Sequence, residues 1–143
     1  MVGAPGSAAG GRDKLVEQVN ARLLAECRKN QCAFKTDSDV LTPGCDQKLD
    51  SLARALLQTK KKLGAGGVTD FKFEVTGYTH ASGKPEFDRE LSARRAATIA
   101  REMVARGVSP NQILAFGTGG NRPPAPPDTA KIPRYEVQVR QAR

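Results

Sequence analysis

Apolar residues recur every three or four positions in three stretches of the chain, and this spacing predicts amphipathic helices. The stretches cover residues 12–29, 45–63 and about 86–106. Pro85 suits the first turn of the third helix and Gly107 suits its C-terminal end. In the first two helices the apolar stripe consists of Val16, Val19, Leu23 and Cys27, and of Leu49, Leu52, Ala53, Leu56 and Leu63. Each helix therefore needs a surface against which to pack.

Apolar and polar residues alternate in other, shorter stretches, which predicts strands. In the clearest of these, Phe71, Phe73 and Val75 alternate with Lys72, Glu74 and Thr76. The same kind of pattern predicts three further strands, at residues 32–35, 113–116 and 135–139. After the first helix, strands and helices alternate along the chain, which requires crossover connections. The pattern therefore predicts a mixed sheet with helices packed on it.

The chain has 143 residues, of which 38% are hydrophobic and 5% are aromatic, with no Trp. These numbers fit one domain with a modest core of Leu, Val, Ile and Ala. No run of about 18 apolar residues is present, so we expect no segment to span a bilayer. Residues 1–11 are small and lack the apolar stretch of a signal peptide. We therefore expect a flexible linker that remains after an anchor or signal was removed.

The formal net charge of +8 favours an anionic partner: nucleic acid, a phospholipid surface or an acidic cell-wall polymer. Binding to nucleic acid would need aromatic side chains beside a basic stripe. The two Tyr and five Phe fall mostly at core positions of the strands instead. Lys60, Lys61 and Lys62 lie in the last turn of a helix, where solvated cations complement the helix dipole. We therefore expect no nucleic-acid partner.

Residues suited to enzyme chemistry are scarce. His80 is the single histidine, and no sequence such as Gly-x-Ser-x-Gly frames a nucleophile. The glycine-rich stretches 64–67 and 117–120 lack the Lys-Ser/Thr pair of a phosphate-binding loop, so we interpret both as turns. We therefore expect a protein that is not an enzyme and needs no cofactor.

Three cysteines, Cys27, Cys32 and Cys45, are too few for a disulfide framework, and their odd number leaves at least one without an internal partner. A Cys32–Cys45 disulfide would tie the first strand to the next helix. Unpaired, half-buried thiols and a Cys27–Cys32 pair are the alternatives. A zinc site of the three cysteines and His80 has enough ligands, but its spacing matches no common zinc pattern. We expect Cys32 and Cys45 to lie close, because they flank one short strand-to-helix loop.

Arg95 has the most informative position in the third helix. On a helical wheel, Ala96 and Ile99 lie on the apolar face and Arg94 falls roughly opposite it. Arg95 lies at the flank, about 80° from the centre of the apolar face. A half-buried guanidinium needs an acceptor, and a carboxylate of the protein or of a ligand could supply it.

Several motifs occur in an order and spacing that resemble one bacterial family. They are Gly77-Tyr78-Thr79-His80, Leu91-Ser92-Ala93-Arg94-Arg95-Ala96, Gly107-Val108-Ser109, Ile113 with Gly117, and the flanking segments 34–44 and Arg134-Tyr135-Glu136-Val137. Over about residues 31–140 the chain resembles the OmpA-like C-terminal domain. This is the peptidoglycan-binding module of bacterial outer-membrane proteins, peptidoglycan-associated lipoproteins and flagellar stator proteins. The resemblance implies a two-layer α/β (α+β) sandwich, with a βαβαββ mixed sheet and two main helices, to which this chain adds an N-terminal helix.

The resemblance also implies a ligand site. In the family, an Asp after Gly-x-Thr and an Arg in a Leu-Ser-x-x-Arg-Ala motif hold the diaminopimelate residue of the peptide stem. The Arg position is Arg95, whereas the Asp position is His80. Asp88 stands where the family usually has Asn, and Arg134 is what remains of a terminal Asn-Arg-Arg motif. The implied ligand-binding residues are Thr79, His80, Asp88, Arg95 and Arg134, with no metal ligand among them.

The leading hypothesis is a periplasmic module, part of a larger envelope-anchored bacterial protein, that binds the peptidoglycan stem peptide without catalysis. Its parts would be a linker (1–11), a helix (12–29) and the OmpA-like domain (31–143). It would meet a membrane only through a missing anchor. The alternative is a degenerate module that binds other proteins of an envelope assembly, because the imidazole of His80 cannot replace a carboxylate that pairs with the diaminopimelate ammonium.

Overall fold

The computed structural model describes residues 3–79, 82–119 and 134–141, with the backbone alone at residues 3–10. Its helices are α1 (Gly3–Lys29), α2 (Asp46–Ala65) and α3 (Pro85–Ala105), followed by a short 3-10 turn, η1 (Pro110–Gln112). Its strands are β1 (Phe71–Gly77), β2 (Ile113–Gly117) and β3 (Tyr135–Gln141). None of the described helices is long and apolar enough to cross a membrane.

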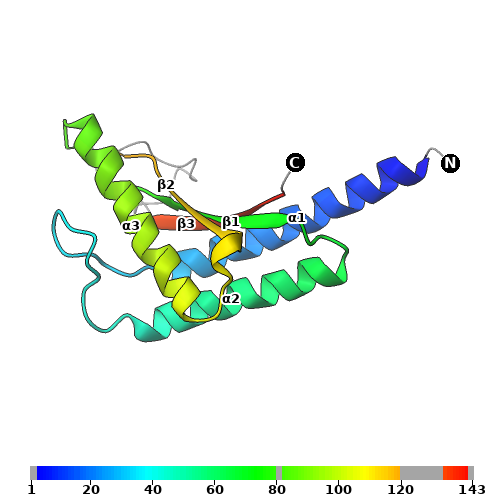
Figure 1. Cartoon of the computed structure of the whole chain (residues 1–143), viewed down its shortest axis with the longest axis horizontal. Helices are drawn as coiled ribbons and strands as arrows, with labels where there is room; N and C mark the ends of the chain where they lie inside the picture. Colours follow the sequence, from blue (N-terminus) through cyan, green and yellow to red (C-terminus); the bar gives the residue numbers. More distant parts are fainter. Residues whose placement is uncertain (1–2, 80–81, 120–133, 142–143) are drawn as a thin grey trace.

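The described strands form one mixed sheet in the order β2-β1-β3. β1 runs parallel to β2, with Phe73 opposite Ile113, and antiparallel to β3, with Phe73 opposite Val139. Parallel neighbours require a crossover, and α3 with η1 provides it between β1 and β2 (Figure 1). Phe73 and Val75 point to the same face of β1 as Gly77, against which α3 packs. That face therefore carries the core.

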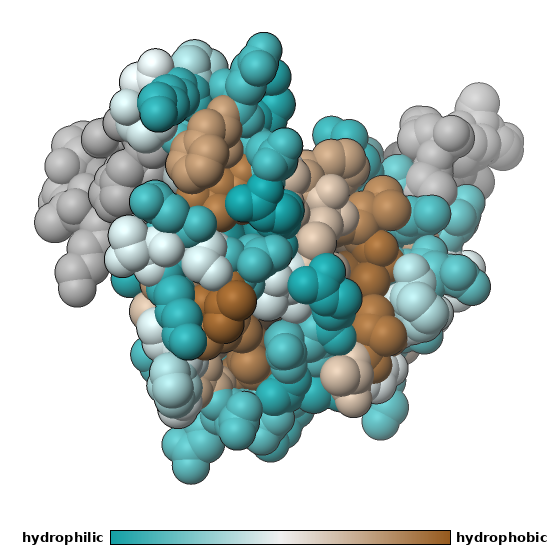
Figure 2. Space-filling view, turned by 60° about the vertical axis from the view of Figure 1, so that its left-hand side comes forward, coloured by the Kyte–Doolittle hydropathy of each residue, from teal (hydrophilic) through white to brown (hydrophobic). Residues whose placement is uncertain are grey.

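All three helices and the sheet contribute to one hydrophobic core. Its largest fully buried side chains are Tyr135, Phe73, Leu23, Leu52, Leu56, Leu63, Ile99, Met103, Val75 and Val137. Helices packed on a mixed sheet confirm the expected α+β fold, and the additional N-terminal helix joins the same core. On the face that Figure 2 shows, apolar patches alternate with polar side chains.

The segment 32–35, expected as the first strand, is not part of this sheet. It makes one isolated antiparallel bridge, between Phe34 and Leu41. Backbone hydrogen bonds from Lys35 N to the Val40 carbonyl and from Thr42 N to the Ala33 carbonyl close the segment into a hairpin of residues 33–42. The described sheet therefore has three strands, one fewer than the sequence pattern indicates.

Side-chain amides occupy the outer edge of β3, where a fourth strand could otherwise pair. Asn20 of α1 donates to the carbonyl of Val139 at 3.1 Å and accepts from its N–H at 2.6 Å. Gln31 donates to the carbonyl of Tyr135 at 2.9 Å and accepts from the N–H of Arg134 at 2.8 Å. Two amides thus satisfy backbone groups that would otherwise pair with a neighbouring strand.

Helix α1 begins at Gly3, so the expected flexible linker over residues 1–11 is wrong from residue 3 onward. Once a helix has nucleated, each added residue forms one more backbone hydrogen bond, and this offsets the low helix propensity of glycine. Pro5 lies in the first turn, where its missing N–H costs no helical hydrogen bond. Val19 and Leu23 of α1 belong to the main core, so the helix is part of the domain rather than an appendage.

Candidate functional site

Two glycines allow α3 to lie directly against the ends of β1 and β2. Gly77 and Gly117 are paired across the two parallel strands. A Cβ at Gly77 would collide with the backbone of Ser92, and a Cβ at Gly117 would come within 2.6 Å of the carbonyl oxygen of Arg89. The N-terminal half of α3 is therefore held at a distance that only glycine permits at these two strand ends.

Ser92 connects α3 to the loops that follow the strands. Its hydroxyl donates to the carbonyl of Arg89 at 2.9 Å and accepts from the N–H of Gly119 at 2.8 Å. The carbonyl of Gly119 in turn accepts from the N–H of Thr79 at 2.9 Å. This chain of hydrogen bonds fixes the backbone of Thr79 beyond the carboxyl end of β1.

Thr79 carries a buried hydroxyl that meets no hydrogen-bond partner among the described residues. The residue is only 9% exposed. A buried hydroxyl without a partner costs about 1–3 kcal/mol, so such groups call for an explanation. A ligand group that hydrogen-bonds to Thr79 would remove this cost.

Asp88 lies in the first turns of α3, 4% exposed, and organises the loop before the helix. One carboxylate oxygen accepts from the N–H of Ser82 at 2.9 Å, and the other accepts from the Ser82 hydroxyl at 2.7 Å. These hydrogen bonds hold the pKa of Asp88 below its usual range. Both carboxylate oxygens thus hold the loop at Ser82 against α3, and a ligand contact of Asp88 stays a prediction from the sequence.

Arg95 reaches from α3 across to the hairpin of residues 33–42. Its Nε donates to the carbonyl of Ser38 at 2.7 Å, and one Nη donates to the carbonyl of Lys35 at 3.3 Å. The guanidinium also lies over the ring of Phe34, 5.0 Å from its centroid. Three of its five N–H groups meet no described acceptor.

Both positive and negative side chains surround the guanidinium of Arg95. Burial lowers the pKa of Arg95, and so does the positive charge of Arg134, while the carboxylates of Asp37 and Asp39 act in the opposite direction. Arg134 is exposed at the start of β3, and its carbonyl accepts from the N–H of Tyr78 at 2.9 Å. The structure thus brings Arg95 and Arg134 to one end of the sheet, beside the end of β1.

Arg94, next in sequence to Arg95, has different contacts. It forms an ion pair with Glu90 one turn earlier on α3, and its Nε lies 3.8 Å from a carboxylate oxygen of Asp39. Its side chain is 42% exposed. Arg94 thus pairs with carboxylates of α3 and of the hairpin, whereas Arg95 donates to hairpin carbonyls.

His80 lies outside the described residues, so its place relative to Thr79 and Arg95 stays a prediction from the sequence. Ser92 and Gly119 were missed as positioning residues. The signal for Ser92 was a small polar residue on the buried face of α3, where a hydroxyl must find a partner. The contact of Arg95 with Phe34 had no signal at all, because 61 positions separate the two residues.

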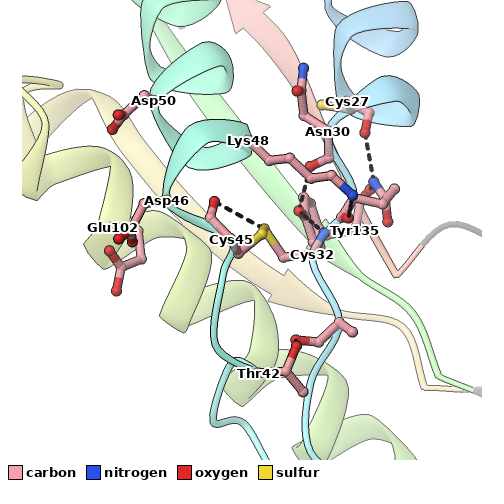
Figure 3. The surroundings of a disulfide bond; sticks show 12 residues. Cys27, Asn30, Cys32, Thr42, Cys45, Asp46, Lys48, Asp50, Glu102 and Tyr135 are labelled. Carbon is pink, nitrogen blue, oxygen red and sulfur yellow. Dashed lines mark hydrogen bonds between the residues drawn. A yellow bond between two sulfur atoms is a disulfide. The ribbon is translucent and has the colours of Figure 1, made fainter.

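A disulfide joins Cys32 and Cys45, whose Cα atoms lie 5.8 Å apart, and ties the hairpin to the start of α2 (Figure 3). The buried hydroxyl of Tyr135 sits beside it: it donates to the carbonyl of Asn30 and accepts from the N–H of Cys32, both at 2.7 Å. Cys27 is a buried free thiol whose pKa burial raises to about 12. The bridge occupies two of the sulfurs that a zinc site would need, and no cluster of metal-binding residues occurs elsewhere in the described chain.

The pattern that defines the OmpA family matches residues 33–135, which include α2, the sheet as far as the start of β3, and Arg95. The chain belongs to the OmpA family. It is 30% identical to outer membrane protein A of Klebsiella aerogenes over 95 residues, 66% of this chain and 25% of that protein. It is 36% identical to the peptidoglycan-binding protein ArfA of Mycobacterium tuberculosis over 74 residues, 49% of this chain and 23% of that protein. The chain thus spans about a quarter of these OmpA family relatives.

Solved structures of three bacterial proteins share the fold. An outer membrane protein from Borrelia burgdorferi is 25% identical, with a TM-score of 0.57 over 76% of this chain and 82% of that one. The peptidoglycan-associated lipoprotein from Burkholderia pseudomallei is 19% identical, with a TM-score of 0.57 over 79% of this chain and 92% of that one. The periplasmic domain of Helicobacter pylori MotB gives a TM-score of 0.59 at 21% identity, over 79% and 78% of the two chains. At these identities the last two support the fold alone.

Proposed function

We propose that this OmpA family domain binds peptidoglycan without catalysis, through the peptide stem of the diaminopimelate type. One relative carries the partner in its name: the peptidoglycan-binding protein ArfA of Mycobacterium tuberculosis. The net charge of +8 supports the same partner, because a basic domain is attracted to an anionic wall.

The observation that carries the proposal is the half-buried guanidinium of Arg95, which keeps three N–H groups for an acceptor close to a second cation, Arg134. A carboxylate of diaminopimelate supplies a bidentate acceptor and compensates two neighbouring positive charges. The buried hydroxyl of Thr79, at the same end of the sheet, provides a neutral hydrogen-bonding group for the ligand backbone. Asp88 acts indirectly, since it holds the loop at Ser82.

We place the domain in the periplasm or cell envelope, as part of a larger anchored protein. The matched proteins from Klebsiella and Haemophilus are named as outer membrane proteins. The Cys32–Cys45 disulfide supports this location, because such bonds persist in oxidising compartments such as the bacterial periplasm.

The direct test is a pull-down with purified sacculi that compares two neighbouring substitutions. Arg95→Ala should lower sacculus binding by roughly ten- to a hundred-fold, which corresponds to the loss of one charge-assisted contact. Arg94→Ala removes the same charge and should leave binding nearly intact. Thermal unfolding of both variants checks that the hairpin remains in place. Equal losses in the two variants would reduce the binding to general charge attraction and contradict the proposed site.

A second candidate is a protein-interaction module that no longer holds diaminopimelate. It is favoured by the contacts of Arg95 with Ser38 and Phe34, which give the guanidinium a structural task, and by a histidine at the family's Asp position. His80→Asp restores the carboxylate and separates the candidates. If the wild type binds no stem peptide at pH 8 or pH 5.5 and His80→Asp gains binding, the pocket is a relic and the interaction module is correct. If the site is in use, the wild type binds more tightly at pH 8, where the imidazole is neutral.

A further inference from the structure

A groove of about 560 Å³ runs between α1 and α2, and it shares no residue with the site around Arg95. Its floor is apolar, formed by Leu15, Val19 and Leu23 of α1 and by Ala55 of α2. Val19 and Leu23 are part of the main core, whereas Leu15 and Ala55 are only partly buried. Leu15 and Ala55 therefore form the accessible part of the floor, directly above the buried core side chains Val19 and Leu23.

Positive side chains line the rim of this groove. Arg22 of α1 and Arg54, Lys61 and Lys62 of α2 all border it, and all are exposed. None of these four makes an ion pair with a described residue. The one carboxylate on the rim, Glu26, lies 3.5 Å from Lys29. The rim thus presents uncompensated positive charge on both sides of an apolar floor.

The spacing of the lining residues matches what a third helix would need. On α2 they occur at 51, 54, 55, 58, 59, 61, 62 and 65, and on α1 at 15, 18, 19, 22, 23 and 26. They include the series 51, 55, 58, 62, 65 and the series 15, 19, 22, 26, whose steps alternate between four and three residues, so each set forms one stripe on its helix. The stripe on α2 covers fourteen residue steps, about 21 Å at 1.5 Å per residue, and the stripe on α1 covers eleven, about 16 Å. Leu15 lies against Gly66, so the start of the α1 stripe is next to the end of α2.

We propose that this groove binds an acidic amphipathic helix of a partner protein, with its apolar stripe on the floor and its carboxylates toward the basic rim. Charge complementarity selects this occupant. A second copy of the chain does not fit, since residues 11–29 carry five Lys or Arg against three Asp or Glu. A bilayer presents a flat surface and cannot follow a groove between two helices, whereas a helix of about 10–12 Å diameter can. The proposal is independent of peptidoglycan binding, because the two sites have no residue in common.

The probe is a fluorescein-labelled peptide of about 18 residues, which is long enough to span the stripe on α2. It carries Leu at alternating three- and four-residue spacing and Glu on both flanks, and its matched control has Lys at every Glu position. Fluorescence anisotropy with the whole chain should show binding of the Glu peptide. The affinity for the Lys peptide should be lower by roughly tenfold or more. Binding of both peptides with equal affinity would overturn the proposal.

Neighbouring lysines provide the protein control. Lys62→Glu reverses a charge on the rim, whereas Lys60→Glu makes the same change at an exposed residue of α2 outside the groove. Lys62→Glu should weaken the Glu peptide about tenfold and Lys60→Glu less than twofold, and Arg54→Ala should weaken it about threefold. Equal effects at Lys60 and Lys62 would overturn the proposal. So would binding to phosphatidylglycerol vesicles that depends on Lys62, with no peptide binding, which would assign the surface to a membrane.

Discussion

Two regions of this domain, the strand ends around Arg95 and the groove between α1 and α2, both carry positive charge, but in different surroundings. Around the strand ends, Arg95 is half-buried and bonded to backbone carbonyls, and the loops beside it are fixed by Ser92 and Asp88. Along the groove between α1 and α2, Arg54 and Lys62 are exposed and make no ion pair with a described residue. In the first region the backbone of α3 lies directly against the strand ends, so we expect side chains added at Gly77 or Gly117 to disturb the fold. The second is specified by composition, so single changes there leave the fold intact and alter only what binds.

The largest expected effect comes from placing a side chain at the strand ends. Gly117→Val should destabilise the domain by about 3 kcal/mol or more, because its side chain would overlap the backbone of α3 at Arg89 and Ala93. Urea denaturation measures this. Gly64→Ala is the matched control: a Cβ at Gly64 in α2 meets nothing within 4 Å, and it should be neutral or stabilising by up to about 1 kcal/mol. A Gly117→Val variant as stable as the wild type would show that α3 does not lie as close as described.

The disulfide should have the next largest effect. The Cys32→Ala/Cys45→Ala double substitution removes a bridge between residues 13 positions apart and should lower the free energy of unfolding by about 3 kcal/mol or less. The bridge anchors the hairpin that Arg95 contacts, so the double substitution should also weaken sacculus binding. Non-reducing peptide mapping of protein expressed in the periplasm checks the pairing beforehand, and recovery of three free thiols would contradict it.

Cys27 should react slowly with alkylating agents at pH 8 in the native state, since burial raises its pKa to about 12.

Asp88 should give a smaller effect that depends on pH. Hydrogen bonds from Ser82 lower its pKa in the folded state, so its contribution to stability is present above the unfolded pKa of about 3.9. That contribution is lost as the pH falls through the folded value. Asp88→Asn should therefore be less stable than the wild type at pH 7, with the difference closing below about pH 4. A difference that stays constant from pH 7 to pH 3 would mean that the carboxylate charge plays no part.

The smallest effects on folding should come from the groove. Arg54→Ala and Lys62→Ala each remove an exposed cation with no described ion pair, and each should change the free energy of unfolding by less than about 0.5 kcal/mol. Thermal unfolding at matched ionic strength measures this. A loss above about 1 kcal/mol in either variant would show that the rim stabilises the fold, and the contrast between the two regions would fail.

The sequence allowed the helices, three of the strands and the position of Arg95 to be predicted, because each depends on local periodicity. The pattern of residues 32–35 looks like a strand, yet Asn20 and Gln31 already occupy the edge of β3, and nothing in a local pattern shows this. The sequence pattern placed the start of the first helix at residue 12, because glycine has a low helix propensity. A helix that has already formed can nevertheless extend through glycines, and a local pattern does not show this. The partners of Arg95 lie more than 50 residues away in the sequence, so they follow from the fold alone.

The central claim is that Arg95 recognises a carboxylate of the peptide stem. Diaminopimelate differs from lysine by one additional carboxylate, so paired stem peptides of the two types isolate this contact. Calorimetric titration should show that the wild type prefers the diaminopimelate peptide by roughly tenfold or more, that Arg94→Ala keeps this preference, and that Arg95→Ala loses it while remaining folded. Equal affinity of the wild type for both peptides, or a preference that survives Arg95→Ala, would contradict the account.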